Sequence, residues 1–180
     1  MKLRTVDLSL CALFAALLAV CAWLVIPAGA VPFTLQTFGV FAALGLLGGK
    51  RGTISILVYL LLGAVGAPVF SGFQGGFGVL LGATGGYLLG FLLCGGVMML
   101  AERFFGDSMR VFLIAAVVGM LLCYGFGTAW FMTVYARGGG TITLGAALGS
   151  CVLPFLLPDA AKLALAALLR ARVKRYVPEL

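Results

Sequence analysis

Two opposite charges interrupt an apolar stretch that reads Val152-Leu153-Pro154-Phe155-Leu156-Leu157-Pro158-Asp159-Ala160-Ala161-Lys162. The surrounding apolar run, Gly145 to Leu169, is long enough to cross a bilayer, since a spanning helix needs about 20 residues. By insertion scales, each charge in the middle of such a span costs about 2.5–3.5 kcal/mol. Because Asp159 and Lys162 are one helical turn apart, they can share a face and partly neutralise each other. The pair predicts either a structural ion pair that fixes helix packing or a polar floor for a ligand with donors and acceptors.

The composition predicts a membrane protein. Of the 180 residues, 63% are hydrophobic and 9% are charged, and the mean hydropathy is +1.22. A soluble domain of this length carries about a quarter charged residues. We therefore expect an all-α, multi-pass membrane protein that forms one domain over residues 1–180.

Hydropathy divides the chain into six apolar segments joined by short loops. Short loops make consecutive helices antiparallel neighbours. The segments are Leu8–Ile26, the stretch between Pro27 and Lys50, the stretch between Arg51 and Gly72, Val79–Leu100, Val111–Tyr135 and Gly145–Leu169.

The basic residues predict the orientation of these six spans. Arg137 alone lies in a loop of one side, and Lys162 lies within a span. All other basic residues fall on the opposite side, which the positive-inside rule makes cytoplasmic, together with both termini. The net charge of +7 thus reflects orientation in a bilayer and does not require a nucleic-acid partner. The basic residues on the predicted cytoplasmic side are Lys2, Arg4, Lys50, Arg51, Arg103, Arg110, Arg170, Arg172, Lys174 and Arg175.

The sequence lacks the residues that several kinds of catalytic and metal site require. The sequence contains no histidine, which excludes Ser-His triads and His-based metal sites. It also lacks a G-x-x-x-x-G-K-[ST] motif, so ATP hydrolysis by a P-loop would need another subunit. The five cysteines lie in apolar runs without C-x-x-C spacing, and we expect small buried side chains, with no disulfide, metal or cofactor. The five cysteines are Cys11, Cys21, Cys94, Cys123 and Cys151.

The first 30 residues imitate a secretion signal. Lys2 and Arg4 precede an apolar stretch, and Ala28-Gly29-Ala30 follows it. The apolar stretch Leu8–Ile26 is longer than the usual signal core of about 7–15 residues. We therefore expect a retained first span.

The second and third segments are irregular. Polar residues and Pro32 crowd the outer end of the second, and Pro68 follows a glycine-rich end of the third. Their regular helical parts are too short to cross the hydrocarbon layer unaided, and irregular backbone at that depth needs cover from protein or a water-filled cavity. The next loop, Ser71–Gly78, is rich in glycine and is either a mobile gate or an ordinary surface turn.

Four sequence blocks resemble the BioY family, the biotin-specific substrate-binding (S) components of prokaryotic energy-coupling factor transporters. One departure is Ala83, where the family usually has proline, which affects loop rigidity more than ligand contacts. The blocks are Val31-Pro32-Phe33-Thr34-Leu35-Gln36-Thr37, Tyr59-Leu60-Leu61-Leu62-Gly63-Ala64-Val65-Gly66-Ala67-Pro68-Val69-Phe70, Gly82-Ala83-Thr84-Gly85-Gly86-Tyr87-Leu88 and Pro158-Asp159-Ala160-Ala161-Lys162.

The resemblance implies six helices, cytoplasmic termini and an outward-facing biotin pocket, covered by the first and third loops and lined by Asp159 and Lys162. It also implies partners, namely a transmembrane coupling subunit and two ATPases. In S components a small-residue face on the first helix typically docks on the coupling subunit. The candidates here are Ala12, Ala15, Ala16 and Ala19.

Biotin offers two ureido N–H donors, a carbonyl and a carboxylate. Asp159 can accept from the ureido N–H groups, and Lys162 can donate to either the carbonyl or the carboxylate. Other polar residues either complete the site or make hydrogen bonds between helices. They are Thr34, Gln36, Gln74, Thr84 and Tyr87.

We therefore predict a biotin-binding transport subunit in a prokaryotic cell membrane. The alternatives are an S component for another vitamin, an intramembrane enzyme that uses Asp159 and Lys162, and a structural subunit without a ligand. The absence of histidine and of a nucleophile constellation argues against the enzyme.

Overall fold

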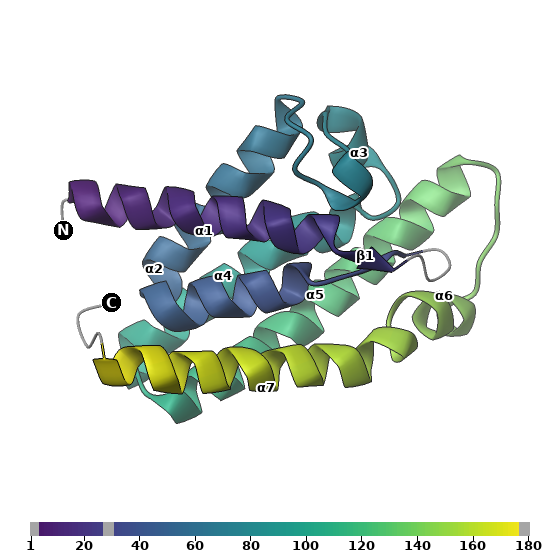
Figure 1. The fold of residues 1–180 in the computed structure, drawn as a ribbon. Helices are drawn as coiled ribbons and strands as arrows, with labels where there is room; N and C mark the ends of the chain where they lie inside the picture. Colours follow the sequence, from purple (N-terminus) through teal and green to yellow (C-terminus); the bar gives the residue numbers. More distant parts are fainter. Residues whose placement is uncertain (1–3, 27–30, 177–180) are drawn as a thin grey trace.

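A computed structural model describes residues 4–26 and 31–176 as a helical bundle with one short two-stranded ribbon (Figure 1). Lys2 and the signal-like residues 28–30 lie outside the described residues. The elements are α1 (Thr5–Trp23), β1 (Val25–Ile26), β2 (Phe33–Thr34), α2 (Gln36–Ala64), the 3-10 turn η1 (Ser71–Phe73), α3 (Phe77–Leu81), α4 (Gly85–Phe105), α5 (Met109–Arg137), α6 (Leu144–Cys151) and α7 (Leu153–Tyr176).

Helix α2 contains the second and third predicted segments and turns sharply at Gly48 (Figure 1). Gly48 has φ 79° and ψ 169°, a conformation that glycine adopts without a side-chain clash. The next residue, Gly49, packs so closely on α4 that an added Cβ would lie 2.6 Å from the Met99 backbone nitrogen. The turn brings Gln36, at the start of α2, within hydrogen-bonding distance of Tyr59 in its second half.

Within residues 4–26 and 31–176, five helical stretches are long and apolar enough to cross a membrane, namely α1, α2, α4, α5 and the α6–α7 stretch. Helix α2 counts once among them although it turns at Gly48. The structure therefore has a mostly helical fold with apolar spans, and six membrane crossings stay a prediction.

The sixth predicted segment is not one regular helix, because α6 ends at Cys151 and α7 begins at Leu153. Val152 between them has φ −125° and ψ −56°. Pro154 has no N–H to donate to the carbonyl of Ser150, so helical hydrogen bonding cannot run through this point. The interruption places α6 at the end of the bundle opposite the two termini and leaves α7 to run back along the bundle (Figure 1).

The end of the bundle opposite the two termini carries the irregular segments (Figure 1). Strands β1 and β2 pair antiparallel, with Val25 opposite Thr34. The third loop contains η1 and α3, and the Trp23 indole N–H donates to the Pro68 carbonyl at 2.8 Å. Trp23 also stacks on Phe73 with ring centroids 5.0 Å apart, so the end of α1 is fastened to this loop.

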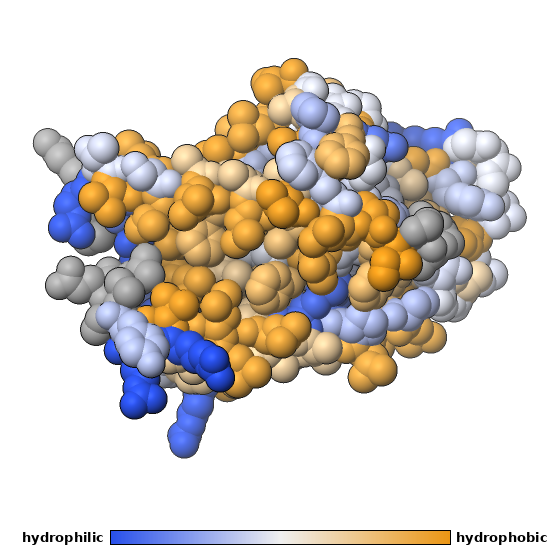
Figure 2. Space-filling model, in the orientation of Figure 1, coloured by the Kyte–Doolittle hydropathy of each residue, from blue (hydrophilic) through white to orange (hydrophobic). Residues whose placement is uncertain are grey.

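The outside of the bundle is apolar, as a lipid-facing surface must be. Leu121 and Ile114 on α5 are 59% and 66% exposed. Figure 2 shows apolar residues over the middle of the visible face and hydrophilic residues gathered near the chain ends. All five cysteines are buried, which agrees with their prediction as small apolar side chains.

The end that holds both termini is tied together by ion pairs. Arg51, just after the turn of α2, pairs with Asp7 of α1 at 3.1 Å. Arg170 and Lys174 of α7 both pair with Asp107, which lies between α4 and α5. Burial opposes ionisation of Asp107, but hydrogen bonds from Lys174 and Arg170 outweigh it and lower the pKa of the carboxyl below its usual value of 3.8.

Candidate functional site

Asp159 and Lys162 form a buried ion pair on α7. The Lys162 Nζ atom lies 2.8 Å from Asp159 Oδ1, and the residues are 4% and 5% exposed, respectively. The i, i+3 spacing therefore places both groups on one helix face, as the sequence predicts.

Two further helices supply hydrogen bonds to the same carboxylate. Thr37, in the first turn of α2, donates to Asp159 Oδ1 at 2.7 Å. Tyr124 of α5 donates to Asp159 Oδ2 at 2.5 Å. A buried charge is tolerated when its partners are this complete, and removal of one partner leaves an uncompensated charge.

The ammonium group of Lys162 has a different environment. It makes one hydrogen bond within the described chain, to Asp159, and lies 4.2 Å from the centre of the Phe33 ring. Phe33 belongs to β2 and stacks on Phe155 of α7 at 5.9 Å. An ammonium group has three N–H donors, so Lys162 retains donors for a ligand.

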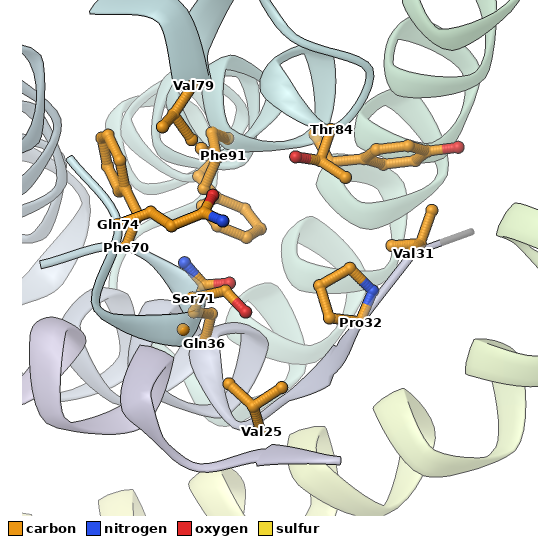
Figure 3. A pocket seen from close by; sticks show the side chains of 13 residues that line it. Val25, Val31, Pro32, Gln36, Phe70, Ser71, Gln74, Val79, Thr84 and Phe91 are labelled. Carbon is orange, nitrogen blue, oxygen red and sulfur yellow. The ribbon is translucent and has the colours of Figure 1, made fainter. Parts of the chain in front are cut away.

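A cavity of about 360 Å³ opens beneath the loops at the end of the bundle opposite the two termini. Its volume falls within the range of small-molecule pockets, about 300–1,000 Å³. Figure 3 shows the Gln74 amide extending into this space, with Pro32 and Val25 on the facing side. Most of the lining is apolar. The lining residues are Val25, Val31, Pro32, Gln36, Phe70, Ser71, Gly72, Gln74, Val79, Thr84, Tyr87, Leu88 and Phe91.

Two polar side chains of the cavity, those of Gln36 and Tyr87, are held by buried partners. Gln36 donates to the Tyr59 hydroxyl at 2.6 Å and accepts from the Thr34 hydroxyl at 2.9 Å. The Tyr87 hydroxyl lies 3.1 Å from the Thr128 hydroxyl on α5. These bonds fix the side-chain conformations before a ligand arrives, which reduces the entropy cost of binding.

The structure divides the predicted binding residues into two groups. Gln36, Gln74, Thr84 and Tyr87 line the cavity. Thr34, Asp159 and Lys162 lie outside its lining, with β2 between the cavity and the ion pair. On this strand Thr34 bonds to Gln36, whereas Phe33 covers Lys162. Asp159 also lines a separate hollow of about 160 Å³ with Tyr124 and Phe41.

The predicted set omits four residues that shape this region. Thr37 and Tyr124 bind Asp159, Tyr59 holds Gln36, and Phe33 covers Lys162. Thr37 follows Gln36 directly in the Val31–Thr37 block, so that block contained a signal for it. Tyr124 lies in an otherwise apolar run, where a hydroxyl needs a partner, but nothing in the sequence identifies which one.

The small-residue face of α1 also divides in two. Ala15 and Ala19 are 2% and 5% exposed and pack in the bundle core. Ala12 and Ala16 are on the exposed side of the helix. A partner can therefore reach only Ala12 and Ala16 without rearrangement of the bundle.

Comparisons with known proteins decide the family. Residues 1–179 match the BioY family. The chain belongs to the BioY family. "Biotin transporter BioY" of Thermotoga maritima is 42% identical over 168 residues, which cover 93% of this chain and 95% of the relative. "Probable biotin transporter BioY" of Pyrococcus horikoshii is 37% identical over 172 residues, which cover 96% and 98%.

The BioY fold of this chain is also similar to a solved structure, the S-component for biotin from an ECF-type ABC transporter. The TM-score is 0.82 at 27% identity, and the match covers 97% of this chain and 95% of the other. BioY membership confirms the resemblance in the four sequence blocks and the helical membrane fold. The transporter names of the relatives support a transport subunit rather than an enzyme.

Proposed function

We propose that this chain is the biotin-binding S component of an energy-coupling factor transporter, which captures biotin outside the cell and delivers it inward. The similarity to a solved S-component for biotin along almost the whole chain carries this proposal. The full-length relatives named as biotin transporters point to the same ligand.

The site chemistry supports a ligand with biotin's mixture of groups. The cavity walls suit a fused ring and an aliphatic chain, and Gln36, Gln74 and Thr84 can bond a polar head. Asp159 is an acceptor for ureido N–H groups, and Lys162 is a donor for the carbonyl or the carboxylate. A ligand in the cavity contacts this pair only after Phe33 moves from its place over Lys162.

The orientation of the chain follows from its charges. The end with Arg51, Arg170 and Lys174 faces the cytoplasm by the positive-inside rule, and the cavity end faces outward. With α2 crossing twice through its turn at Gly48, the chain crosses six times and both termini are cytoplasmic. The chain then resides in a prokaryotic cell membrane.

Inward delivery requires partners. No G-x-x-x-x-G-K-[ST] motif occurs in the sequence, so energy from ATP would come through a transmembrane coupling subunit and two ATPases. Ala12 and Ala16 provide a small, exposed face on α1 for the coupling subunit.

The variant Ala16→Trp should abolish energised biotin uptake and leave equilibrium biotin binding within about twofold of wild type. Equal loss of both activities would remove this face from the proposal.

Equilibrium binding tests the proposed ligand. The purified full-length protein in detergent should bind radiolabelled biotin saturably, with a one-to-one stoichiometry, and unlabelled thiamine or riboflavin should not compete. Biotin should also raise the thermal midpoint, since a ligand that binds only the folded state stabilises it. Competition by another vitamin and none by biotin would reassign the ligand. Folded protein that binds neither would contradict the proposed function.

A further inference from the structure

The basic residues near the two termini are not all used in the same way. Arg51 pairs with Asp7, and Arg170 and Lys174 pair with Asp107. Lys50 and Arg103 are both exposed, and neither has a carboxylate partner within residues 4–26 and 31–176. An arginine and a lysine without such a partner are available to an anion from outside the chain.

Lys50 and Arg103 lie on one groove of about 710 Å³, between the turn of α2 and the last turns of α4. Met99 and Leu100 also line it, and they are 38% and 56% exposed. No atom lies within 4 Å of a Cβ placed on Gly96, so the groove is open at this position. The groove thus combines two cations with an exposed apolar wall.

The turn at Gly48 builds this groove. It places Gly49 against the Met99 backbone, so Lys50 comes beside the end of α4. Glu102 also lines the groove, but its Oε2 atom accepts a hydrogen bond from the Gly49 N–H at 2.7 Å. That N–H begins the second half of α2, where the helix dipole favours a negative charge. Glu102 thus binds inward through Oε2, while its Oε1 atom is buried without a hydrogen-bond partner among the described residues. The exposed charges of the groove, on Lys50 and Arg103, are both positive.

We propose that this groove binds an anionic phospholipid of the leaflet nearest the chain termini. The lipid phosphate lies between Lys50 and Arg103, and the start of an acyl chain lies along Met99 and Leu100 over Gly96. A free phosphate would satisfy the cations but leave the exposed apolar wall unused. A lipid satisfies both, and the bilayer supplies it at the depth where apolar side chains give way to basic ones. This site is separate from the cavity at the outer end and does not depend on its ligand.

Native mass spectrometry of the full-length protein tests the site. The probe is palmitoyl-oleoyl phosphatidylglycerol added to delipidated protein in detergent, with palmitoyl-oleoyl phosphatidylcholine as the neutral comparison. Wild-type protein should retain the anionic lipid preferentially. Each of Lys50→Gln and Arg103→Gln should weaken its binding about fivefold, because a cation near lipid phosphate contributes about 1 kcal/mol. The variant Gly96→Leu should also block binding, since it fills the open part of the groove while all charges remain.

Two matched controls separate the groove from general effects. Arg172→Gln makes the same charge change at an exposed position of the same end, outside the groove. Gly125→Leu adds the same side chain at a position on α5 that also has no atom within 4 Å. Both controls should retain wild-type lipid binding, and thermal midpoints in lipid-free detergent should show that all variants fold.

Three results would overturn the proposal. One is equal retention of the two lipids, and a second is unchanged phosphatidylglycerol binding in folded Gly96→Leu. The third is equal weakening by Arg172→Gln, which would mean that the basic end attracts anionic lipid without a defined site. If groove variants kept lipid binding but failed to assemble with a coupling subunit, the groove would be a protein-docking surface instead.

Discussion

Helix α7 takes part in two clusters of charges that differ in what surrounds them. Asp159 and Lys162 have side chains that are 6% and 5% exposed, and their partners are protein groups from α2 and α5. The two clusters differ in their exposure to water. Near the end of α7, Arg170 and Lys174 share Asp107, whose side chain is 46% exposed.

The difference shows what each cluster requires. Water can solvate the 46% exposed Asp107 when a partner is lost, so its pair with the 23% exposed Lys174 is worth little more than an ordinary surface pair. Arg170 is 4% exposed, but it also donates to the Gly45 carbonyl, which remains when Asp107 is replaced. Asp159 is buried away from water, so its charge is stabilised by three hydrogen-bond donors from the protein. A site of this kind can also gain more from a ligand, because hydrogen bonds to a charged group are stronger where water is scarce.

The largest expected effect comes from Asp159→Asn. This substitution keeps the shape, removes the charged acceptor and leaves Lys162 buried without a counter-ion. The free energy of unfolding should fall by about 3–5 kcal/mol, and biotin affinity should fall about a hundredfold. Thermal unfolding in detergent and radiolabelled biotin binding measure the two effects.

The matched control is Asp107→Asn, which makes the same chemical change in the exposed cluster. It should leave biotin affinity unchanged. Near-wild-type affinity in folded Asp159→Asn would remove the ion pair from the proposed binding site and make it a structural feature only.

A double substitution separates the structural cost of the pair from its value in binding. Asp159→Leu and Lys162→Leu alone should each destabilise the protein strongly, because each leaves one charge unpaired. The double variant should recover about 1–4 kcal/mol relative to the additive expectation from the two single variants. Biotin binding should not recover with it. Recovery of both stability and binding would show that the ligand does not use these charges.

Much of this comparison could be predicted from local sequence. The i, i+3 spacing of Asp159 and Lys162 fixes their shared face, and the basic pair Lys50-Arg51, which separates the second and third predicted segments, lies next to the turn of α2 at Gly48. What local spacing cannot predict is tertiary contact. Thr37 lies 122 residues from Asp159 in the sequence, and only helix packing joins them.

The cavity shows the same limit. Five neutral polar residues were expected to complete a site with Asp159 and Lys162. Of these, Gln36, Gln74, Thr84 and Tyr87 line one cavity, whereas Thr34 does not. The position of Asp159 and Lys162 behind β2 depends on how the first loop folds, which two extended residues, Phe33 and Thr34, determine. The spacing of residues in the sequence assigns them to a helix face, but it does not show which residues line a cavity and which lie behind the lining.

A smaller effect is expected from Tyr124→Phe. It removes one hydrogen bond to Asp159 and preserves the ring, so the stability loss should be about 1.5–3 kcal/mol. Biotin affinity should fall less than in Asp159→Asn, because Thr37 and Lys162 still hold the carboxylate. Thermal unfolding and equilibrium binding of the same preparation provide the comparison. A loss as large as that of Asp159→Asn would mean that Tyr124 contacts the ligand directly.

The smallest effect is the pH dependence of the exposed cluster. Because Lys174 and Arg170 lower the pKa of Asp107 below 3.8, the folded state binds a proton there less readily than the unfolded chain. The stabilisation is therefore fully present above the unfolded pKa and is lost as the pH falls through the folded value. Solvent screening of a 46% exposed side chain limits it to about 1 kcal/mol at most.

The difference in thermal midpoint between wild type and Asp107→Asn isolates this contribution from that of the other carboxylates. The difference should be constant from about pH 7 to pH 5, should begin to shrink near the unfolded pKa of 3.8, and should vanish once the pH is below the lower, folded-state pKa. High salt should shrink it at neutral pH, because exposed pairs are screened. A difference that persists in acid and in high salt would show that Asp107 acts by packing rather than by charge, and the contrast between the two clusters of α7 would then not be one of hydration.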